Sequence, residues 1–320
     1  MRIEVLENGA LYRVWTPAKI NLFFEILGKR PDGYHDVETL VAPISLYDRL
    51  DCYFSESDEP EITLECLDAD GRPRSDVPTD GSNLVARAYR VYCEEMKKNF
   101  SYNKFPKAHV KIFKKIPTKA GLGGGSSDAA GLLSVLNRLG GVRVPQTLLF
   151  EAAGLLGSDV ALFLEESASI GRGRGELVEP FKLPKLWAAI VKPSFGLSTS
   201  EVYRRYSTTV RSPKRSLDDV LSSIRQYDGD CFAEFMSRLI FNRLEEPASF
   251  LWDGVERWKS MLNAFPETLV AQMSGSGTAF FALCSNEENA KRVANSVRDL
   301  CRQNPVAGSR VEDVFVVQTL

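Results

Sequence analysis

A glycine-rich segment near the middle of the chain constrains the fold more than any other feature. It reads Pro117-Thr118-Lys119-Ala120-Gly121-Leu122-Gly123-Gly124-Gly125-Ser126-Ser127-Asp128. An apolar stretch typical of a strand precedes it, and a helix with one apolar face follows it. Glycines let backbone N–H groups approach an anion, and the start of a helix adds unpaired donors and the positive end of a dipole. The segment therefore predicts a phosphate-binding loop between a strand and a helix.

Other well-known phosphate-binding motifs do not match this loop. The chain has no G-x-x-x-x-G-K-[ST] sequence, which excludes a Walker A loop, and Ser126 stands where the dinucleotide-binding fingerprint has its third glycine. The H-R-D and D-F-G signatures of protein kinases are absent too. A tight turn alone does not require four glycines and two serines directly before a helix. A nucleotide or phosphate site of another kind is the interpretation that is left.

Composition argues against several other classes of protein. Lys and Arg number 40 and Asp and Glu 42, so the net charge of −2 creates no field that would attract nucleic acid or an anionic membrane. The six cysteines form no C-x-x-C pair and there are only two histidines, which disfavours a zinc site or a disulfide framework. Early acidic residues and the lack of a long apolar run disfavour a signal peptide or a spanning helix. We expect a cytoplasmic protein with no nucleic-acid or membrane partner.

The length of 320 residues suggests two domains, and the sequence changes character around Pro180 to Pro184. We expect an N-terminal domain over residues 1–182 and a C-terminal domain over residues 183–320. Strands and helices intermix in both halves, which favours the α+β class. The expected strands are Tyr12 to Trp15, Leu22 to Leu27, Arg49 to Phe54, Glu61 to Leu67, His109 to Ile116, Trp187 to Val191 and Arg310 to Val317, with a strand–loop–strand at Leu269 to Cys284; the expected helices include Leu84 to Lys98 and Asn286 to Gln303.

Four further motifs accompany the glycine-rich loop. They are Thr16-Pro17-Ala18-Lys19-Ile20-Asn21-Leu22, Arg30-Pro31-Asp32-Gly33-Tyr34-His35, Gly157-Ser158-Asp159-Val160 and Ser274-Gly275-Ser276-Gly277-Thr278. Together they resemble the GHMP family of small-metabolite kinases, and in particular its branch that acts on 4-diphosphocytidyl-2-C-methyl-D-erythritol. The resemblance implies a two-domain fold, in which an N-terminal domain contains a left-handed β-α-β unit, an exception to the usual handedness, and the C-terminal domain is ferredoxin-like.

The resemblance also implies a reaction. The γ-phosphoryl group of ATP, supplied with Mg2+, would pass to the 2-hydroxyl of this small-molecule substrate, giving the 2-phosphate and ADP in the non-mevalonate route to isoprenoid precursors. Asp159, in the first turn of a short helix, would accept the hydroxyl proton, and Lys19 would keep it ionised and oriented. The loop from Pro117 to Ser127 would hold the ATP phosphates, with Asn83 and Lys114 touching the nucleotide. The sequence indicates no carboxylate pair dedicated to magnesium.

Further residues are implied for the acceptor. Tyr34 would stack on the cytosine, His35 would read its hydrogen-bonding edge, and Tyr203 would supply a second aromatic face. Asn21 and Thr199 would lie nearer the methylerythritol. The second glycine loop, Gly275-Ser276-Gly277, would approach the first. Without the resemblance, ordinary packing, surface turns and a hairpin are the more common roles of such residues.

Two alternatives follow from the same residues. A mevalonate or homoserine kinase would keep the ATP loop and change the acceptor pocket, so the Tyr34-His35 pair discriminates between them. A catalytically silent nucleotide-binding sensor would be expected to lose Lys19 and Asp159, and both are present. Ala161 and Thr278 stand where the family often has proline, and neither change removes a functional group. The acidic stretch from Asp68 to Asp80 has no functional interpretation, and the oligomeric state is open.

Overall fold

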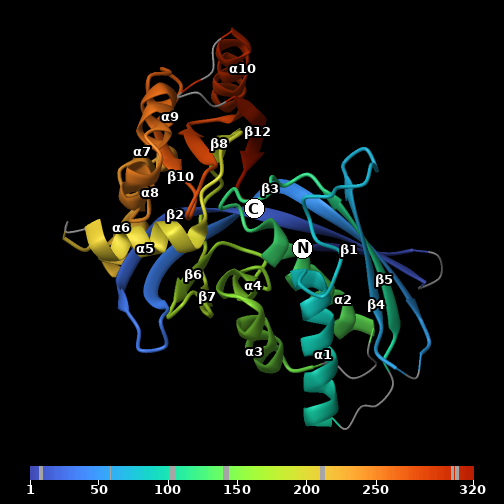
Figure 1. Ribbon diagram of the computed structural model, residues 1–320. Helices are drawn as coiled ribbons and strands as arrows, with labels where there is room; N and C mark the ends of the chain where they lie inside the picture. Colours follow the sequence, from blue (N-terminus) through green and yellow to red (C-terminus); the bar gives the residue numbers. More distant parts are fainter. Residues whose placement is uncertain are drawn as a thin grey trace. The chain divides into compact units, whose positions relative to one another are not determined.

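The computed structural model describes residues 1–6, 10–57, 59–100, 105–139, 144–209, 213–303, 306 and 310–320 (Figure 1). The chain forms two compact units that alternate along the sequence. The first unit comprises Met1–Ala18, Leu46–Ile116 and Gly123–Glu166, and the second comprises Lys19–Ser45, Pro117–Leu122 and Ser167–Leu320. The division falls within two long strands, β2 (Leu11–Lys29) and β3 (His35–Ser55), and within the glycine-rich loop.

The first unit contains paired strands and four helices among its described residues. Strand β1 (Arg2–Leu6) runs antiparallel to the start of β2, and β5 (Lys107–Lys114) pairs antiparallel with the end of β3 and parallel with β4 (Ile62–Asp68). The helices are α1 (Leu84–Phe100), α2 (Gly124–Leu139), α3 (Gln146–Leu156) and α4 (Ser158–Leu162). Helix α1 packs against α2 and α3. Strand β5 alternates buried and less buried residues, as a strand with one covered face does.

The second unit contains an antiparallel four-stranded sheet in the order β10-β11-β8-β12. These strands are β8 (Trp187–Pro193), β10 (Val270–Met273), β11 (Phe280–Cys284) and β12 (Val311–Gln318). The start of β3 pairs with β6 (Ser169–Arg172), which pairs with β7 (Leu177–Pro180), and β2 pairs with β9 (Phe241–Asn242). The helices are α5 (Thr199–Thr209), α6 (Leu217–Gln226), α7 (Phe232–Ser237), α8 (Glu245–Leu251), α9 (Gly254–Asn263) and α10 (Glu287–Gln303).

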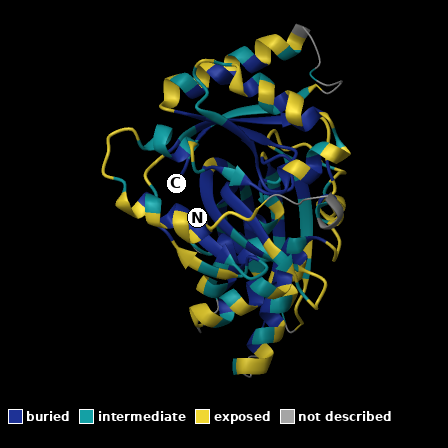
Figure 2. Ribbon diagram, turned by 90° about the vertical axis from the view of Figure 1, so that its left-hand side faces the viewer, coloured by how far each residue is buried: buried dark blue, intermediate teal, exposed yellow. Residues whose placement is uncertain are grey.

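Helices α9 and α10 pack on this four-stranded sheet. Trp258 of α9 is fully buried there, together with Phe280 of β11 and Val293 of α10. Figure 2 shows the burial of each residue, with buried positions gathered in the strands and exposed positions on the outer sides of the helices. The hydrophobic core of this unit therefore holds the sheet, and the loops between its strands are free to carry polar groups.

Most expected elements are present, and the α+β class is confirmed. The separation of Tyr12–Trp15 from Leu22–Leu27 is wrong, because β2 runs through both segments. Proline usually interrupts a central strand, but Pro17 lies inside a run buried from Thr16 to Ile26. Burial on both faces keeps the strand extended across it. The boundary near residue 182 stays a prediction.

Candidate active site

The leading half of the glycine-rich loop, Pro117–Leu122, belongs to the second unit. The Lys19 backbone N–H donates to the Leu122 carbonyl (3.0 Å), and the Ala279 N–H donates to the Ala120 carbonyl (3.0 Å). The Ser274 hydroxyl donates to the Gly121 carbonyl (3.0 Å). These bonds join three segments that are far apart in sequence: the first motif, the first glycine loop and the second glycine loop. The predicted approach of the two glycine loops is present.

The Gly121 backbone lies directly against the second glycine loop. Its φ is +72°, and a Cβ atom built there would lie 2.0 Å from the Ser274 carbonyl oxygen and 3.1 Å from the Gly277 nitrogen. Real Cβ atoms do not approach backbone atoms so closely. Only glycine satisfies both the left-handed backbone and the contact at this position.

Lys19 and Asn21 lie next to each other beneath the second glycine loop. The Lys19 ammonium donates to Asn21 Oδ1 at 2.5 Å, and the two side chains are 3% and 2% exposed. A Cβ atom on Gly275 would lie 3.3 Å from both Asn21 Oδ1 and Lys19 Nζ. Asn242 of β9 holds this loop from another side, donating to the carbonyls of Met273 (2.8 Å) and Gly275 (2.7 Å). Asn242 has no motif around it, so the sequence did not indicate this role.

The trailing half of the loop, Gly123–Ser127, belongs to the first unit, and Gly124 to Ser127 form the first turn of α2. The Ser127 hydroxyl is buried and has no hydrogen-bond partner among the described residues. Buried hydroxyl groups normally have a partner. An unpartnered hydroxyl at the start of a helix, next to glycines, is the environment that a phosphate oxygen or its metal ion would complete.

A buried charge cluster lies under this half of the loop, in the first unit. The Lys114 ammonium, at the end of β5, donates to Asp48 of β3 and to Asp128 of α2 (2.8 Å to Asp128 Oδ2). The Asp48 carboxylate also accepts from the Lys115 and Ile116 backbone N–H groups at 2.6 and 2.8 Å. A Cβ atom on Gly124 would lie 3.2 Å from Lys114 Nζ, so the cluster touches the loop backbone.

The charges in this cluster perturb one another. Burial, followed by the nearby Asp128 carboxylate, raises the pKa of Asp48 to about 6, although Lys114 opposes the shift. Burial lowers the pKa of Lys114, but the two carboxylates outweigh it and the net shift is upward. Lys114 is therefore held as a cation between two acids. Sequence reasoning selected Lys114 but missed Asp48 and Asp128, although the latter directly follows the two serines.

Asn83 and Asp159 lie at helix starts in the first unit. The Asn83 side chain accepts from the Val85 N–H (2.9 Å) and donates to the Pro78 carbonyl (2.6 Å), so it caps α1. Asp159 lies in the first turn of α4, as predicted, after Gly157. Lys19 and Asp159 belong to different units, and their pairing stays a prediction, as does a contact of Asn83 with the nucleotide.

The predicted acceptor residues divide into two groups, both in the second unit. The His35 ring lies 5.1 Å from Tyr203 and 5.9 Å from Tyr206, measured between ring centroids. His35 Nε2 is buried without a hydrogen-bond partner among the described residues. Tyr34 is 55% exposed, and the Arg174 guanidinium lies 5.0 Å above its ring. The structure therefore brings His35 and Tyr203 together, whereas Tyr34 is next to a cation that the sequence did not indicate.

Thr199 and Ser276 connect this region with the second glycine loop. Their hydroxyl groups lie 2.7 Å apart, one at the start of α5 and the other between Gly275 and Gly277. Burial, followed by the positive charge of Lys29, lowers the pKa of His35, so its ring is neutral at pH 7. A neutral imidazole with one free nitrogen can donate or accept one hydrogen bond, which suits recognition of a polar ring edge.

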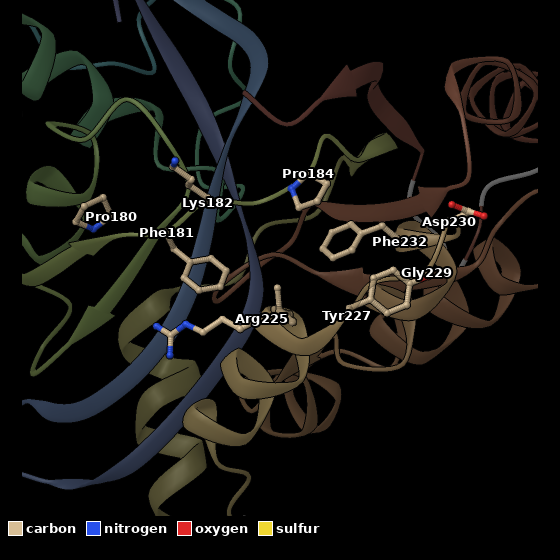
Figure 3. Close-up of a pocket in the computed structure, with 10 residues that line it drawn as sticks. Pro180, Phe181, Lys182, Pro184, Arg225, Tyr227, Gly229, Asp230 and Phe232 are labelled. Atoms are coloured by element: carbon tan, nitrogen blue, oxygen red, sulfur yellow. The ribbon is translucent and has the colours of Figure 1, made fainter.

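A separate hollow of about 600 Å³ lies in the second unit (Figure 3). Phe181, Tyr227 and Phe232 line it together with Lys182 and Arg225. The described residues that line it include none of the predicted site residues. Among the described part of the chain, no group of three or more His, Cys, Asp or Glu residues could hold a metal ion, and no helix is long and apolar enough to cross a bilayer.

Two segments of the chain match family models of known proteins. Residues 83–166 match the family model of the GHMP kinases N terminal domain, and residues 210–303 match that of the GHMP kinases C terminal domain. Curated proteins named 4-diphosphocytidyl-2-C-methyl-D-erythritol kinase are similar along most of the chain. The protein of Bacillus pumilus is 35% identical over 290 residues, covering 90% of this chain and 93% of its own length. That of Desulfotalea psychrophila is 33% identical over 320 residues, covering 99% of this chain and 98% of its own length.

Two solved structures are similar to nearly the whole chain. A crystal structure of 4-(cytidine 5'-diphospho)-2C-methyl-D-erythritol kinase superposes with a TM-score of 0.71 at 29% identity, covering 96% of this chain and 98% of the other. A homoserine kinase from Cytophaga hutchinsonii superposes with a TM-score of 0.70 at 17% identity, covering 98% and 96%. The second likeness shows the fold alone.

Proposed function

Because the chain belongs to the GHMP kinase family, and its curated relatives are 4-diphosphocytidyl-2-C-methyl-D-erythritol kinases, we propose that it transfers the γ-phosphoryl group of ATP to the 2-hydroxyl of that compound. The products are ADP and the 2-phosphate, an intermediate of non-mevalonate isoprenoid synthesis. The observation that carries the proposal is the similarity to these kinases over at least nine tenths of the chain. The protein is a small-molecule kinase.

The glycine-rich loop binds the ATP phosphates in this proposal. Backbone N–H groups from Gly123 to Ser126 face the anion at the start of α2, where the helix dipole favours negative charge. The unpartnered Ser127 hydroxyl supports this role because it needs an oxygen or a metal ion to complete it. Magnesium in kinases is held largely by phosphate oxygens and water, and Ser126 or Ser127 would add a protein oxygen.

Asp159 and Lys19 perform the chemistry in this proposal. From its place in the first turn of α4, Asp159 accepts the proton of the 2-hydroxyl as the oxygen attacks the γ-phosphorus. Lys19 stabilises negative charge near the acceptor oxygen. Phosphoryl transfer has a loose transition state, so alignment and charge neutralisation contribute more than the strength of the base.

Recognition of the cytidine belongs to His35 and Tyr203 in this proposal. The buried, unpartnered Nε2 of a neutral His35 supports a hydrogen bond to the base, and Tyr203 offers an aromatic face beside it. Tyr34, with Arg174 above its ring, forms the outer wall, and Asn21 and Thr199 lie towards the methylerythritol.

The experiment measures ADP release from Mg-ATP with three acceptors in parallel: 4-diphosphocytidyl-2-C-methyl-D-erythritol, mevalonate and homoserine. We expect turnover with the first alone. Asp159→Asn should lower kcat by about 10²- to 10⁴-fold, the usual contribution of a general base. Asp219→Asn is the matched control, because Asp219 also lies in the first turn of a helix, α6, and it should leave kcat unchanged.

The other outcomes separate the alternatives. Preference for mevalonate or homoserine would show that the kinase assignment holds while the acceptor residues are misassigned. Binding of ATP without turnover on any acceptor would favour the silent sensor. Full activity of Asp159→Asn would remove the proposed base but leave the reaction intact.

A further inference from the structure

A row of three buried polar side chains connects β3 with the candidate catalytic lysine. Thr39 Oγ1 lies 2.8 Å from the Phe23 carbonyl oxygen and 2.9 Å from Asn21 Nδ2, and Asn21 Oδ1 lies 2.5 Å from Lys19 Nζ. Thr39, Asn21 and Lys19 are all at most 3% exposed. All belong to the second unit, and Thr39 appears in none of the motifs that the sequence analysis singled out.

The polarity of each hydrogen bond in the row follows from the one before it. A carbonyl oxygen only accepts, so the single proton of the Thr39 hydroxyl is used on Phe23. Towards Asn21 the hydroxyl can then only accept, which requires the NH2 group of the amide to face Thr39. The carbonyl oxygen of Asn21 is thereby turned towards Lys19, where an ammonium needs an acceptor. Reversal of the amide would place its NH2 group against the Lys19 ammonium, so that donors would face donors.

The opposite side of the lysine leaves little room for adjustment. The Gly275 backbone is so near that a Cβ atom there would lie 3.3 Å from both Lys19 Nζ and Asn21 Oδ1. Asn242 fixes that backbone through its two donated bonds. The Asn21 amide is thus held between a fixed loop and Thr39, and Thr39 and the Lys19 ammonium favour the same orientation of it.

We propose that Thr39 is a positioning residue that fixes the orientation of the Asn21 amide and through it the place of the Lys19 ammonium. The inference rests on the proposed function, in which Lys19 stabilises the reacting oxygen. Thr39 itself touches no reacting atom. Its loss should therefore reduce the rate of the chemical step and leave ATP binding unchanged.

The test compares Thr39→Val, which keeps the shape and removes the hydroxyl, with Thr39→Ser, which keeps the hydroxyl. We expect kcat of Thr39→Val to fall by about 10- to 100-fold, as for a misplacement of about 1 Å in an active site, with the KM for ATP within twofold of wild type. Thr39→Ser should restore kcat. Thr319→Val is the matched control, because Thr319 is also buried and its hydroxyl accepts from the Leu186 N–H outside this row.

A double-mutant cycle separates positioning from a general structural effect. In an Asn21→Ala background, Thr39→Val should cost no further activity, because Thr39 acts only through that amide. A persistent cost in this background, or kcat of Thr39→Val within twofold of wild type, would overturn the inference.

A second measurement does not depend on turnover. Acetic anhydride labelling followed by mass spectrometry gives the rate of acetylation at Lys19, which should rise at least tenfold in Thr39→Val and remain slow in Thr39→Ser. An unchanged rate would contradict the inference. If the wild-type protein shows no kinase activity while labelling responds as expected, the proposed function fails and the positioning by Thr39 stands.

Discussion

Replacement of Gly121 by alanine tests the contact between the two glycine loops. A Cβ atom at this position would lie 2.0 Å from the Ser274 carbonyl oxygen, with a backbone φ of +72°. The left-handed conformation costs a non-glycine residue about 1–2 kcal/mol. To relieve the overlap the loops must separate, which breaks the Ser274 to Gly121 bond and the Ala279 to Ala120 bond. Each contributes about 0.5–1.5 kcal/mol.

Gly121→Ala is therefore expected to lower the free energy of unfolding by about 2–5 kcal/mol. Urea denaturation followed by tryptophan fluorescence measures the change. Because Lys19 also donates its backbone N–H to Leu122 in the same loop, kcat/KM for ATP should fall as well. The loss of activity should be present at urea concentrations where the variant is fully folded.

Gly71→Ala separates backbone strain from the overlap. Gly71 has a φ of +85°, and a Cβ atom there would meet nothing within 4 Å. In this control the free energy of unfolding should fall only by the cost of the left-handed conformation, about 1–2 kcal/mol, and activity should be unchanged. If Gly121→Ala is no less stable than Gly71→Ala and turns over ATP normally, the argument from the loop contact is refuted.

Two further predictions concern buried charge. Lys114→Met should lower the free energy of unfolding by about 3–5 kcal/mol at pH 7, because it leaves Asp48 and Asp128 buried without their cation. Burial raises the pKa of Asp48 to about 6 against the opposing charge of Lys114, and removal of that charge raises the pKa further. Protonation of Asp48 then relieves the repulsion, so urea denaturation at pH 5 should show a smaller loss than at pH 7. Burial and Lys29 lower the pKa of His35, so its contribution to stability is present above the ordinary value of about 6.5 and is lost as the pH falls below it. The KM for the cytidyl substrate should be constant above pH 6.5 and rise when the pH falls below the lowered pKa of His35. The variant His35→Gln should abolish that rise. A KM that rises above pH 7 would contradict a neutral His35.

Local pattern was enough to predict much of this fold. The capped helix at Leu84, the strand at Trp187 and the short helix that begins before Asp159 follow from caps and apolar spacing, and each is present. The long strand β2 was expected as two separate strands because Pro17 has the appearance of a strand end, and burial from the rest of the fold keeps the strand extended there.

Some features of the site could also be predicted from local sequence, and others could not. The glycine-rich loop is visible in sequence because one short segment contains all of its glycines. Thr39 and Asn242 are not, because each acts on residues that are distant in the chain through one or two hydrogen bonds. No local composition signals such a bond, because its partners meet only when distant segments of the chain have folded together.

The alternation of the two units along the chain determines how the protein can be divided. Each unit consists of three segments of the polypeptide, so no single cut releases either of them as one continuous piece. A cleavage after residue 182 would leave Lys19 to Ser45 attached to the amino-terminal fragment, although β2 pairs with Phe241 and Asn242 in the other fragment. Lys19 would then be separated from the Asn242 and Gly275 that enclose it. Activity recovered from two such fragments would have to come from their reassociation, and it would depend on the square of the fragment concentration when both are dilute.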